Sequence, residues 1–415
     1  MQRRVVVTGL GAVTPLGNDV PTTWSKLIAG ESGIDRITLF DPSPFTVQIA
    51  GEVKNFDPLN YVEKKDARRM DRNVQFAVAA AREAVADAGL SISPCNAERV
   101  GVIVGSAVGG IRTMLDQQKV LEERGPTRVS PFFLQNLIPD TASGQVAIYL
   151  GAKGPNMAVV SACATGGHAL GEAAETIRRG DADVIIAGGT EAAIVPLVLA
   201  GFTVMRALAT GDGGPPAAAC RPFDRTRQGF VMSEGCAILV LEELEHARRR
   251  GARIYAELVG YGSSNDAFDL AAPAEQGEGI AQAMRMALRK AGLCPEDVDY
   301  INAHGTATPL NDKYETAAVK AVFGEHAYRL AMSSTKSMTG HMMGAAGAVE
   351  AMACVLAITH GIIPPTINYR YPDPDCDLDC VPNQARRQTV RVALSDSMGL
   401  GGHNSCLIFR SLTDA

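Results

Sequence analysis

The chain has 415 residues, of which 46% are hydrophobic, 20% are charged and only 5% are aromatic. This composition excludes a disordered chain, and the length favours two domains or two fused halves. The net charge of −6 at pH 7 excludes a protein that attracts nucleic acid or anionic membranes over its whole surface, so an acidic partner would need a local basic patch.

The beginning of the chain predicts a strand rather than an export signal. Its apolar run in "VVVTGLGA" is interrupted by Gly9 and Gly11 and is followed by Pro15. The nine cysteines show no disulfide framework, which is typical of a reducing compartment. We therefore expect a cytoplasmic protein that does not enter a membrane. No nucleotide cofactor is expected either, because "GLGAVT" has Thr14 where a dinucleotide-binding motif needs its third glycine.

Further along the chain, short β-branched segments alternate with segments of helical periodicity. This alternation predicts an α/β fold in which helices pack on mostly parallel sheets. The expected strands are 4–9, 99–106, 157–162, 183–189, 236–242, 253–262, 298–303, 329–334, 390–395 and 405–409.

The sequence also repeats itself. The helix "VAAAREAVADAGL" and its following strand are echoed by "IAQAMRMALRKAGL", and "AVVSACATGGHALGEAA" is echoed by "LAMSSTKSMTGHMMGAAGAVEAM". A third echo, of "VIIAGGTEA" by "VALSDSMGLGG", comes in the same order, which predicts a duplication with halves 1–250 and 251–415. Residues 107–140 have no counterpart in the second half, and we expect them to form a helical cap.

One cysteine stands at a special place. In "VVSACATGGHAL", Cys163 lies where an apolar strand gives way to a helix, so the unpaired amides and positive dipole end of the helix should lower its pKa. The alternative is a small buried core residue, which is our interpretation of most other cysteines. Cys376 and Cys380 in "DCDLDC" resemble half of a metal site, but no second pair completes it, and a loop is expected there.

Partners for this thiol come from the second half. His304 in "NAHGTATP" and His341, five residues after Lys336 in "STKSMTGHMMGAAG", both follow predicted strands. Open α/β sheets gather ligands at such strand ends, so we expect the four side chains to converge. A zinc site is the competing interpretation, but it lacks a ligand spacing. The remaining histidines are expected to be ordinary surface or core residues: His168, His246, His326, His360 and His403.

Together, "TGLGAVTPLG", "SACATGGHALGEA", "RPFDRTRQGFVMSEG", "NAHGTATPLND", "STKSMTGHMMGAAGAVE" and "GLGGHN" resemble the β-ketoacyl-acyl-carrier-protein synthases over nearly the whole chain. The resemblance implies a thiolase-like fold, with duplicated halves in five αβαβα layers, and a homodimer. It implies that an acyl group moves from the phosphopantetheine arm of acyl carrier protein to Cys163. Malonyl-acyl-carrier-protein then loses carbon dioxide and attacks the acyl-enzyme, giving 3-oxoacyl-acyl-carrier-protein without a cofactor of the enzyme's own.

The same resemblance assigns roles to individual residues. His304 and His341 would donate hydrogen bonds to the enolate, Lys336 would order the site electrostatically, and the amides of Cys163 and Leu400 would form the oxyanion hole. The family usually has a gating phenylalanine where this chain has Leu400. The acyl pocket would comprise Val108, Phe133, Phe202 and Leu400, with Thr306 and Thr308 contacting the pantetheine arm.

Two further sets of residues follow from the resemblance. Lysines and arginines at helical spacing in "KKDARRMDR", with two outliers, would dock the acidic carrier protein. A group around Asp396, where the family usually has asparagine, would form either a cation site or a structural hydrogen-bond network. The docking residues are Lys64, Lys65, Arg68, Arg69, Arg128 and Arg206, and the second set is Asn302, Glu315, Glu350, Ser395 and Asp396.

Other functions remain to be weighed against this one. A ketosynthase of a polyketide or specialised lipid pathway would use the same residues. A thiolase would need a second catalytic cysteine near the end of the chain, and a starter-unit synthase would have one histidine and one asparagine. A non-catalytic chain-length factor would lack Cys163. A cysteine hydrolase would release a free acid without needing a malonyl donor.

Overall fold

The computed structural model describes residues 3–211 and 213–412, and a ten-stranded sheet system runs through it. The strand order is β10-β9-β13-β14-β8-β1-β7-β6-β4-β5, so each half contributes five strands in the same relative order. The strands are β1 (Val5–Val13), β4 (Val100–Gly105), β5 (Asn156–Met157), β6 (Val184–Glu191), β7 (Gly235–Glu243), β8 (Ala256–Asn265), β9 (Tyr300–Asn302), β10 (Ala331–Ser333), β13 (Val392–Gly399) and β14 (His403–Arg410), beside the two-stranded pairs β2 (Asp35–Arg36) with β3 (Ile49–Ala50) and β11 (Ile362–Ile363) with β12 (Arg386–Arg387).

The α/β class is confirmed, but the expectation of mostly parallel sheets was wrong. Parallel pairing is confined to β4, β5 and β6 in the first half and to β9, β10 and β13 in the second. The remaining pairs are antiparallel, in part because the tight hairpin between β13 and β14 forces the chain to reverse. The predicted strand 157–162 is also shorter, since only Asn156–Met157 pairs with a neighbour.

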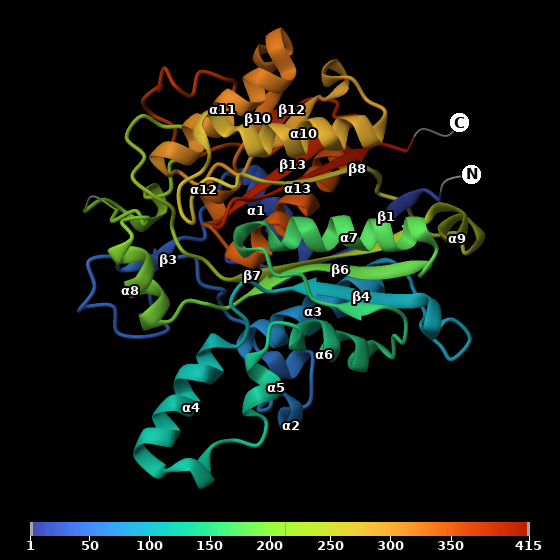
Figure 1. Ribbon diagram of the computed structural model, residues 1–415, viewed down its shortest axis with the longest axis vertical. Helices are drawn as coiled ribbons and strands as arrows, with labels where there is room; N and C mark the ends of the chain where they lie inside the picture. Colours follow the sequence, from blue (N-terminus) through green and yellow to red (C-terminus); the bar gives the residue numbers. More distant parts are fainter. Residues whose placement is uncertain (1–2, 212, 413–415) are drawn as a thin grey trace.

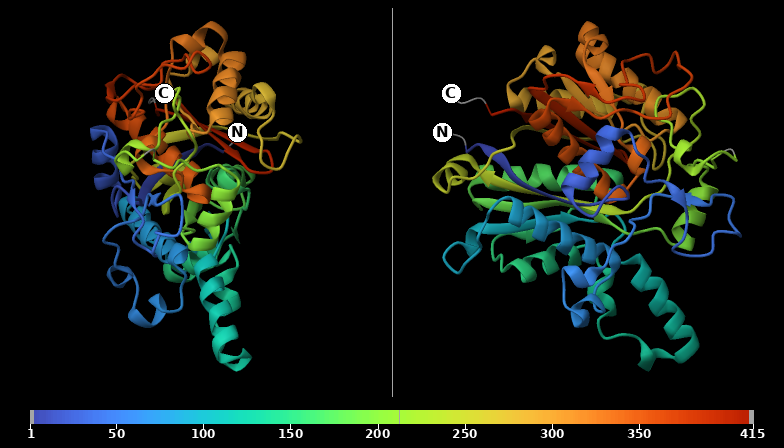
Figure 2. Two further views of the ribbon diagram at one scale, coloured as in Figure 1. Left: turned by 90° about the vertical axis from the view of Figure 1, so that its left-hand side faces the viewer. Right: turned by 180° about the vertical axis from the view of Figure 1, so that it is seen from behind.

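Helices and sheets alternate in five layers (Figures 1 and 2). Helices α7 and α13 lie between the two half-sheets, α3 and α6 cover the outer face of the first, and α10 and α11 cover the outer face of the second. The helices are α1 (Val20–Ala29), α2 (Lys64–Ala67), α3 (Arg72–Asp87), α4 (Ile111–Arg124), α5 (Phe133–Leu137), α6 (Thr141–Leu150), α7 (Thr165–Arg179), α8 (Pro196–Val204), α9 (Leu244–Arg249), α10 (Glu278–Ala291), α11 (Pro309–Phe323), α12 (Lys336–Thr339) and α13 (Ala346–His360).

The middle layer depends on small residues where α7 and α13 meet. A Cβ added to Gly166 would lie 2.7 Å from the amide nitrogen of Ala348, and one added to Gly347 would lie 2.7 Å from that of Gly167. Glycine is therefore required at this crossing, which brings the starts of both helices together. The segment Met343–His360 is long and apolar enough to cross a membrane, yet 83% of it is buried inside the molecule, as in the core helix of a globular protein.

The inserted segment 107–140 is helical, as expected, but it does not act as a cap. Its helices α4 and α5 extend away from the layered body (Figure 1), and Ile111 is the one residue of α4 that is buried. An amphipathic helix without a surface to cover cannot bury its apolar stripe within a single chain. The insertion therefore projects from the molecule and leaves exposed apolar side chains such as Leu134.

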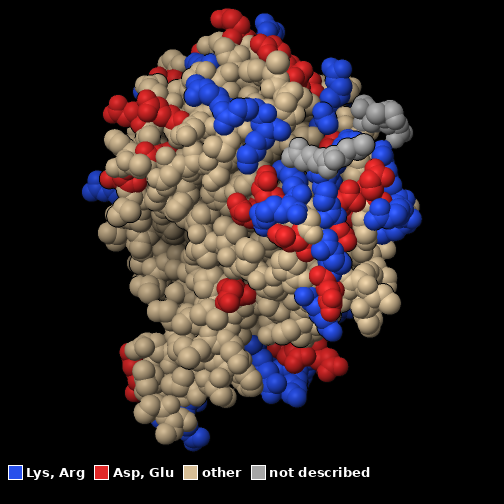
Figure 3. All heavy atoms as spheres, turned by 45° about the vertical axis from the view of Figure 1, so that its right-hand side comes forward, with Lys and Arg blue, Asp and Glu red and all other residues tan. Residues whose placement is uncertain are grey.

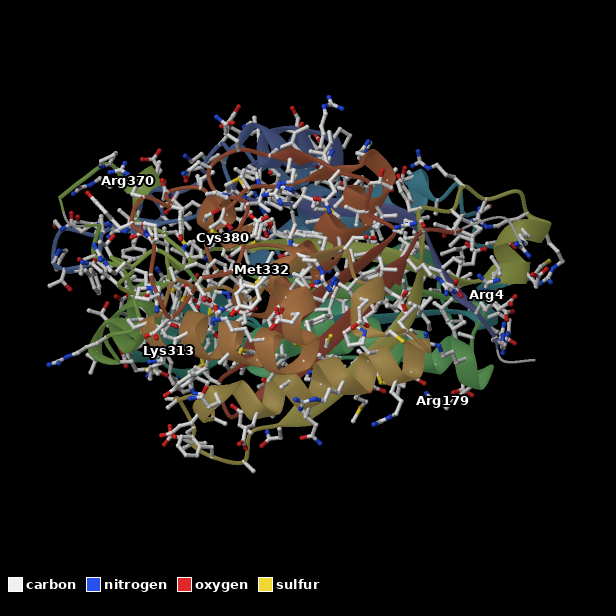
Figure 4. All side chains as sticks on the ribbon, turned by 90° about the horizontal axis from the view of Figure 1, so that it is seen from above. Arg4, Arg179, Lys313, Met332, Arg370 and Cys380 are labelled. Carbon is white, nitrogen blue, oxygen red and sulfur yellow. The ribbon has the colours of Figure 1, made fainter. Side chains whose placement is uncertain are left out.

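Charged side chains concentrate at the end of the molecule that carries the chain termini (Figure 3). Glu257 accepts from both Arg4 and Arg410, and Arg99 pairs with Asp183. Arg4 and Arg179 lie at this end, whereas Lys313 and Arg370 lie at the opposite one (Figure 4). Ion pairs also occur at the opposite end, where Lys313 pairs with Asp375.

Candidate active site

Cys163 lies in a tight turn that leads into the central helix α7. The turn is a 3-10 helix over Ala162–Ala164, and α7 begins at Thr165. Ala162 has φ 49, in the left-handed region that residues other than glycine rarely adopt. The thiol is half-buried and receives a hydrogen bond from the amide of Leu400, which lies in the turn of the β13–β14 hairpin. The structure thus brings together the two amides expected to form an oxyanion hole.

His304 and His341 form an orthogonal pair beside this thiol. Their ring centroids lie 5.4 Å apart with an interplanar angle of 88°, and both residues are buried. His304 follows β9 as predicted, while His341 is fixed by backbone bonds to Val231 and Ser233. Burial and the nearby charge of Lys336 hold the pKa of both imidazoles well below its usual value. Both rings are therefore neutral near pH 7, and each can donate one N–H hydrogen bond.

Lys336 acts on this pair from within the protein. Its ammonium group is 1% exposed and forms an ion pair with Glu350 of α13. Burial raises the pKa of Glu350, and the adjacent ammonium lowers it. Lys336 does not line the pocket, so its effect on the two histidines is electrostatic.

The expected lowering of the Cys163 pKa was wrong for the resting protein. Burial raises the pKa of this thiol to about 11, although the Lys336 charge and the Leu400 amide act in the opposite direction. The cost of placing a thiolate in a low-dielectric site exceeds the benefit of the helix start, because Cys163 precedes the first turn of α7 instead of lying in it. The resting nucleophile is therefore a thiol.

A single pocket joins these groups. Its volume is about 370 Å³, and its walls include Cys163, His304 and His341. Phe202, Leu400, Thr306 and Thr308, all predicted from the sequence, also line it, as do Ala271, Ala272, Met205, Leu310 and Asn404.

Two residues predicted for the acyl pocket do not line it in this chain. Val108 packs against the same apolar cluster as Phe202 but does not line the pocket. Phe133 lies on α5 in the projecting insertion. No sequence pattern indicates that Phe133 lies outside the pocket, because the direction of the insertion depends on what it packs against.

The basic residues predicted to dock a carrier protein are divided between two places. Arg206 lies at the pocket and Arg68 lines a separate polar hollow with Arg72 and Arg112. The expected helical spacing holds only in part, because α2 ends at Ala67 and the chain turns before α3. Lys64 and Lys65 are on α2, Arg69 stacks over the Phe132 ring at 4.4 Å, and Arg128 follows α4.

A buried acidic cluster lies behind His304. Glu315 accepts from the amide of Gly305 at 2.7 Å, and its carboxyl group hydrogen-bonds Asp396. Ser395 is paired with Asn302 across β13 and β9. Asp396 also interacts with the backbone amide of His304, and the Asn302 side chain with the Tyr300 hydroxyl, but the two carboxyl groups still face each other inside the protein. A shared proton or a cation would satisfy these oxygens.

Within the ranges 3–211 and 213–412, no group of three or more His, Cys, Asp or Glu side chains is arranged to hold a metal ion. Cys376 and Cys380 are buried in a segment without regular structure. The amide of Met332 on β10 donates to Asp379, and Figure 4 shows Met332 and Cys380 close together. The two thiols thus pack against the edge of the second half-sheet.

We expect Asp396→Asn to flatten the pH dependence of stability. Burial raises the pKa of Asp396 in the folded state, so folding favours its protonated form. Its contribution is complete below the unfolded pKa of about 4 and is lost as pH rises through the folded value, so wild type should lose about 1–3 kcal/mol more than the variant between pH 5 and pH 8. Urea unfolding at both pH values measures this difference. If wild type and variant lost equal free energy of unfolding between pH 5 and pH 8, the shared proton would be contradicted. If their difference disappeared with added K⁺ or Mg²⁺, a bound cation would be indicated.

Known proteins are similar to this chain over nearly its whole length. Residues 2–247 match the model of the β-ketoacyl synthase N-terminal domain, and residues 255–370 match that of the C-terminal domain. The chain is 53% identical over 408 residues to 3-oxoacyl-[acyl-carrier-protein] synthase 2 of Staphylococcus aureus (strain COL), covering 98% of each. It is 51% identical over 409 residues to the protein of that name from Synechocystis sp. (strain ATCC 27184 / PCC 6803 / Kazusa), covering 99% of this chain and 98% of the relative.

Solved structures of ketosynthases are also similar to this chain over its whole length. A type II polyketide ketosynthase bound to its acyl carrier protein and a hexaketide has a TM-score of 0.91 and 36% identity, covering 99% of this chain and 100% of that one. The ishigamide ketosynthase/chain length factor also has a TM-score of 0.91, with 40% identity and full coverage of both chains. The expectation of duplicated halves in a thiolase-like fold is confirmed by these neighbours.

Proposed function

The chain belongs to the β-ketoacyl synthase family, and from this premise we propose that it condenses an enzyme-bound acyl group with malonyl-acyl-carrier-protein in fatty acid elongation. The products are 3-oxoacyl-acyl-carrier-protein, carbon dioxide and free carrier protein. The observation that carries this function is the convergence of Cys163, His304 and His341 on one apolar pocket.

The first step is acyl transfer to Cys163. The sulfur attacks the thioester carbon of the acyl-carrier-protein, the bond to the pantetheine sulfur breaks, and the Cys163 proton ends on the leaving thiol. The amides of Cys163 and Leu400 stabilise the oxyanion that forms on the way. Exchange of one thioester for another is nearly balanced in energy. Because burial raises the pKa of the resting thiol, proton removal and attack are expected to occur together.

The second step is loss of carbon dioxide from the malonyl group. The bond between the carboxylate and the methylene carbon breaks, and its electron pair moves into the thioester, which becomes an enolate. Neutral His304 and His341 donate hydrogen bonds to the enolate oxygen, and their depressed pKa keeps them in the required form. The charge of Lys336 lowers the pKa of both rings and so maintains this state.

The third step forms the carbon–carbon bond. The enolate carbon attacks the acyl-enzyme carbonyl, whose oxygen again lies between the amides of Cys163 and Leu400. Collapse of this intermediate releases the Cys163 sulfur as a thiolate, which takes a proton from solvent. No step requires a cofactor held by the protein, and we propose that the phosphopantetheine arm arrives on the carrier protein. Thr306 and Thr308, whose hydroxyls are 3.0 Å apart at the pocket wall, would contact that arm.

Incubation with acyl- and malonyl-carrier-protein together tests this function. We expect a 3-oxoacyl product and an acyl mass increment on Cys163, whereas release of free acid without malonyl donor would indicate a hydrolase. A polyketide ketosynthase is the second candidate, since solved polyketide enzymes share the fold. Fatty acid elongation is favoured because identity to the 3-oxoacyl synthases is 53%, against 36–40% for those structures. Trials of short, medium and long primers would also show how Leu400 affects selectivity.

The carrier protein is proposed to dock at the pocket mouth, in the cytoplasm where both proteins would meet. We expect Arg206→Glu to raise KM for acyl-carrier-protein about tenfold at low ionic strength with little change in kcat, because Arg206 lies at the pocket and the partner is acidic. Steady-state kinetics at two salt concentrations measure this, since screening should reduce the difference. Arg248→Glu, on α9 and outside the pocket, is the matched control. An unchanged KM would place the dock elsewhere.

We propose that the protein is a homodimer formed along the edge strand β5. Asn156–Met157 ends the sheet and pairs on one side only. Apolar side chains cluster near this edge on β5, α6 and the insertion: Met157, Val160, Ile148, Leu134 and Ile138 are 44%, 53%, 73%, 67% and 48% exposed. An unpaired edge among exposed apolar side chains is typical of a surface that a second copy covers.

Substitution of Ile148 by glutamate should therefore shift the dimer toward monomer at micromolar concentration. The added carboxylate would be desolvated in the interface without a partner. Sedimentation velocity on wild type and variant measures the change, with Tyr371→Glu, an equally polar change at a 51% exposed site elsewhere, as control. A wild type that sediments as a monomer would refute the proposal.

A further inference from the structure

A buried imidazole that the reaction does not use connects the two turns of the oxyanion site. His168 lies in the first turn of α7 and is 7% exposed. Its Nδ1 is 2.7 Å from the hydroxyl of Ser161, and its Nε2 is 3.1 Å from the carbonyl oxygen of Asn404 and 3.1 Å from the hydroxyl of Ser263. Ser161 starts the turn that holds Cys163, and Asn404 lies on β14.

The chemistry of these partners fixes the direction of each hydrogen bond. The Asn404 carbonyl can only accept, so Nε2 carries the proton and Nδ1 accepts from the Ser161 hydroxyl. Burial lowers the pKa of His168, which keeps the ring neutral and preserves this pattern. A neutral imidazole is rigid and places one donor and one acceptor at opposite sides of the ring. Few other side chains can bridge the same two groups.

Both turns at the ends of this bridge need to be held in place. Ala162 has φ 49, a left-handed conformation that is unfavourable for a residue other than glycine. The hairpin turn that carries Leu400 lies against it. A Cβ added to Gly399 would lie 2.6 Å from the Ser161 carbonyl oxygen and 3.2 Å from the Cys163 nitrogen. Asn404 pairs with Met398 across this hairpin, so the bridge from His168 reaches the strand that leads out of the turn.

Resting on the proposed function, we propose that His168 is a positioning residue for acyl transfer. Through Ser161 on one side and Asn404 on the other, it holds the amides of Cys163 and Leu400 at the spacing that one thioester oxygen requires. Oxyanion donors act only when they are preorganised, and a displacement of about 1 Å can cost about a hundredfold in rate.

Ser161→Ala and His168→Gln test this inference. Three rates are measured on each folded variant: acylation of Cys163 by acyl-carrier-protein, alkylation of Cys163 by iodoacetamide, and decarboxylation of malonyl-carrier-protein. We expect acylation to slow about tenfold to a hundredfold in each variant. Alkylation should change little, because it requires the thiol but not the paired amides. Decarboxylation, which depends on His304 and His341, should be the less affected enzymatic step.

The double variant and a control on the same helix complete the experiment. If Ser161 and His168 act as one unit, the double variant should be no slower than the slower single variant. Thr176→Val removes a buried hydroxyl of α7 that bonds only its own helix, and it should leave all three rates unchanged. Ser161→Ala is a small change, so it remains informative even where His168→Gln does not fold.

Two results would overturn the inference. Acylation at the wild-type rate in folded Ser161→Ala would show that the bridge does not position the amides. Equal losses of acylation and alkylation would show a purely structural role. A wild type that forms no acyl adduct would refute the proposed function as well, which separates that failure from the first two.

Discussion

Replacing Cys163 with alanine should abolish condensation, with the rate falling about 10⁴-fold or more. In the proposed mechanism the thiol holds the acyl chain between the two half-reactions, and loss of a covalent nucleophile is not compensated by the remaining site. The expected signature is the disappearance of both the acyl mass increment on the protein and the 3-oxoacyl product. Mass spectrometry of the protein after incubation with acyl-carrier-protein, together with product analysis, measures both.

Cys95→Ala is the matched control for this substitution. Cys95 is an exposed free cysteine far along the chain from the pocket residues, so its loss should change neither the adduct nor the product. Undiminished carbon–carbon bond formation in Cys163→Ala would refute the proposed mechanism. Loss of the adduct with retained decarboxylation of malonyl-carrier-protein would support it, because that step uses the histidines.

Single substitution of His304 or His341 by alanine should slow malonyl decarboxylation about 10²–10³-fold. In the proposed mechanism each ring supplies one hydrogen bond to the developing enolate, and removing one such donor from a preorganised site has typically had effects of this size. The neutral state of both rings depends on their burial and on Lys336, so the effect should persist over the pH range around neutrality. Release of carbon dioxide from labelled malonyl-carrier-protein measures the step directly.

Acylation of Cys163 should be much less affected in these two variants. The proposed oxyanion donors for acyl transfer are backbone amides, which the substitutions leave in place. His360→Ala serves as control, since His360 is exposed and stacks on Trp24 away from the pocket. A variant that decarboxylates at the wild-type rate would remove that histidine from the proposed mechanism.

Much of the candidate site followed from local sequence. Cys163 and His304 each follow an apolar segment and precede glycine-containing turns, and such strand ends face the ligand side of an α/β sheet. The duplicated motifs indicated that two such edges meet, and the pocket contains Cys163, His304 and His341. The sequence predicts only an ordinary surface or core residue at His168, and no local pattern marks its distant partners Ser263 and Asn404.

The sequence by itself determined the fold class, the repeat and the chemical identity of the reacting groups, because hydrophobic periodicity and residue type are local properties. Only the tertiary structure decided how those groups behave. Burial raises the pKa of Cys163, and burial together with the charge of Lys336 on another segment lowers that of His304. The direction of the 107–140 insertion and the mixed strand pairing were likewise decided by packing. Desolvation and charge act through space, so their magnitude depends on neighbours that sequence spacing does not reveal.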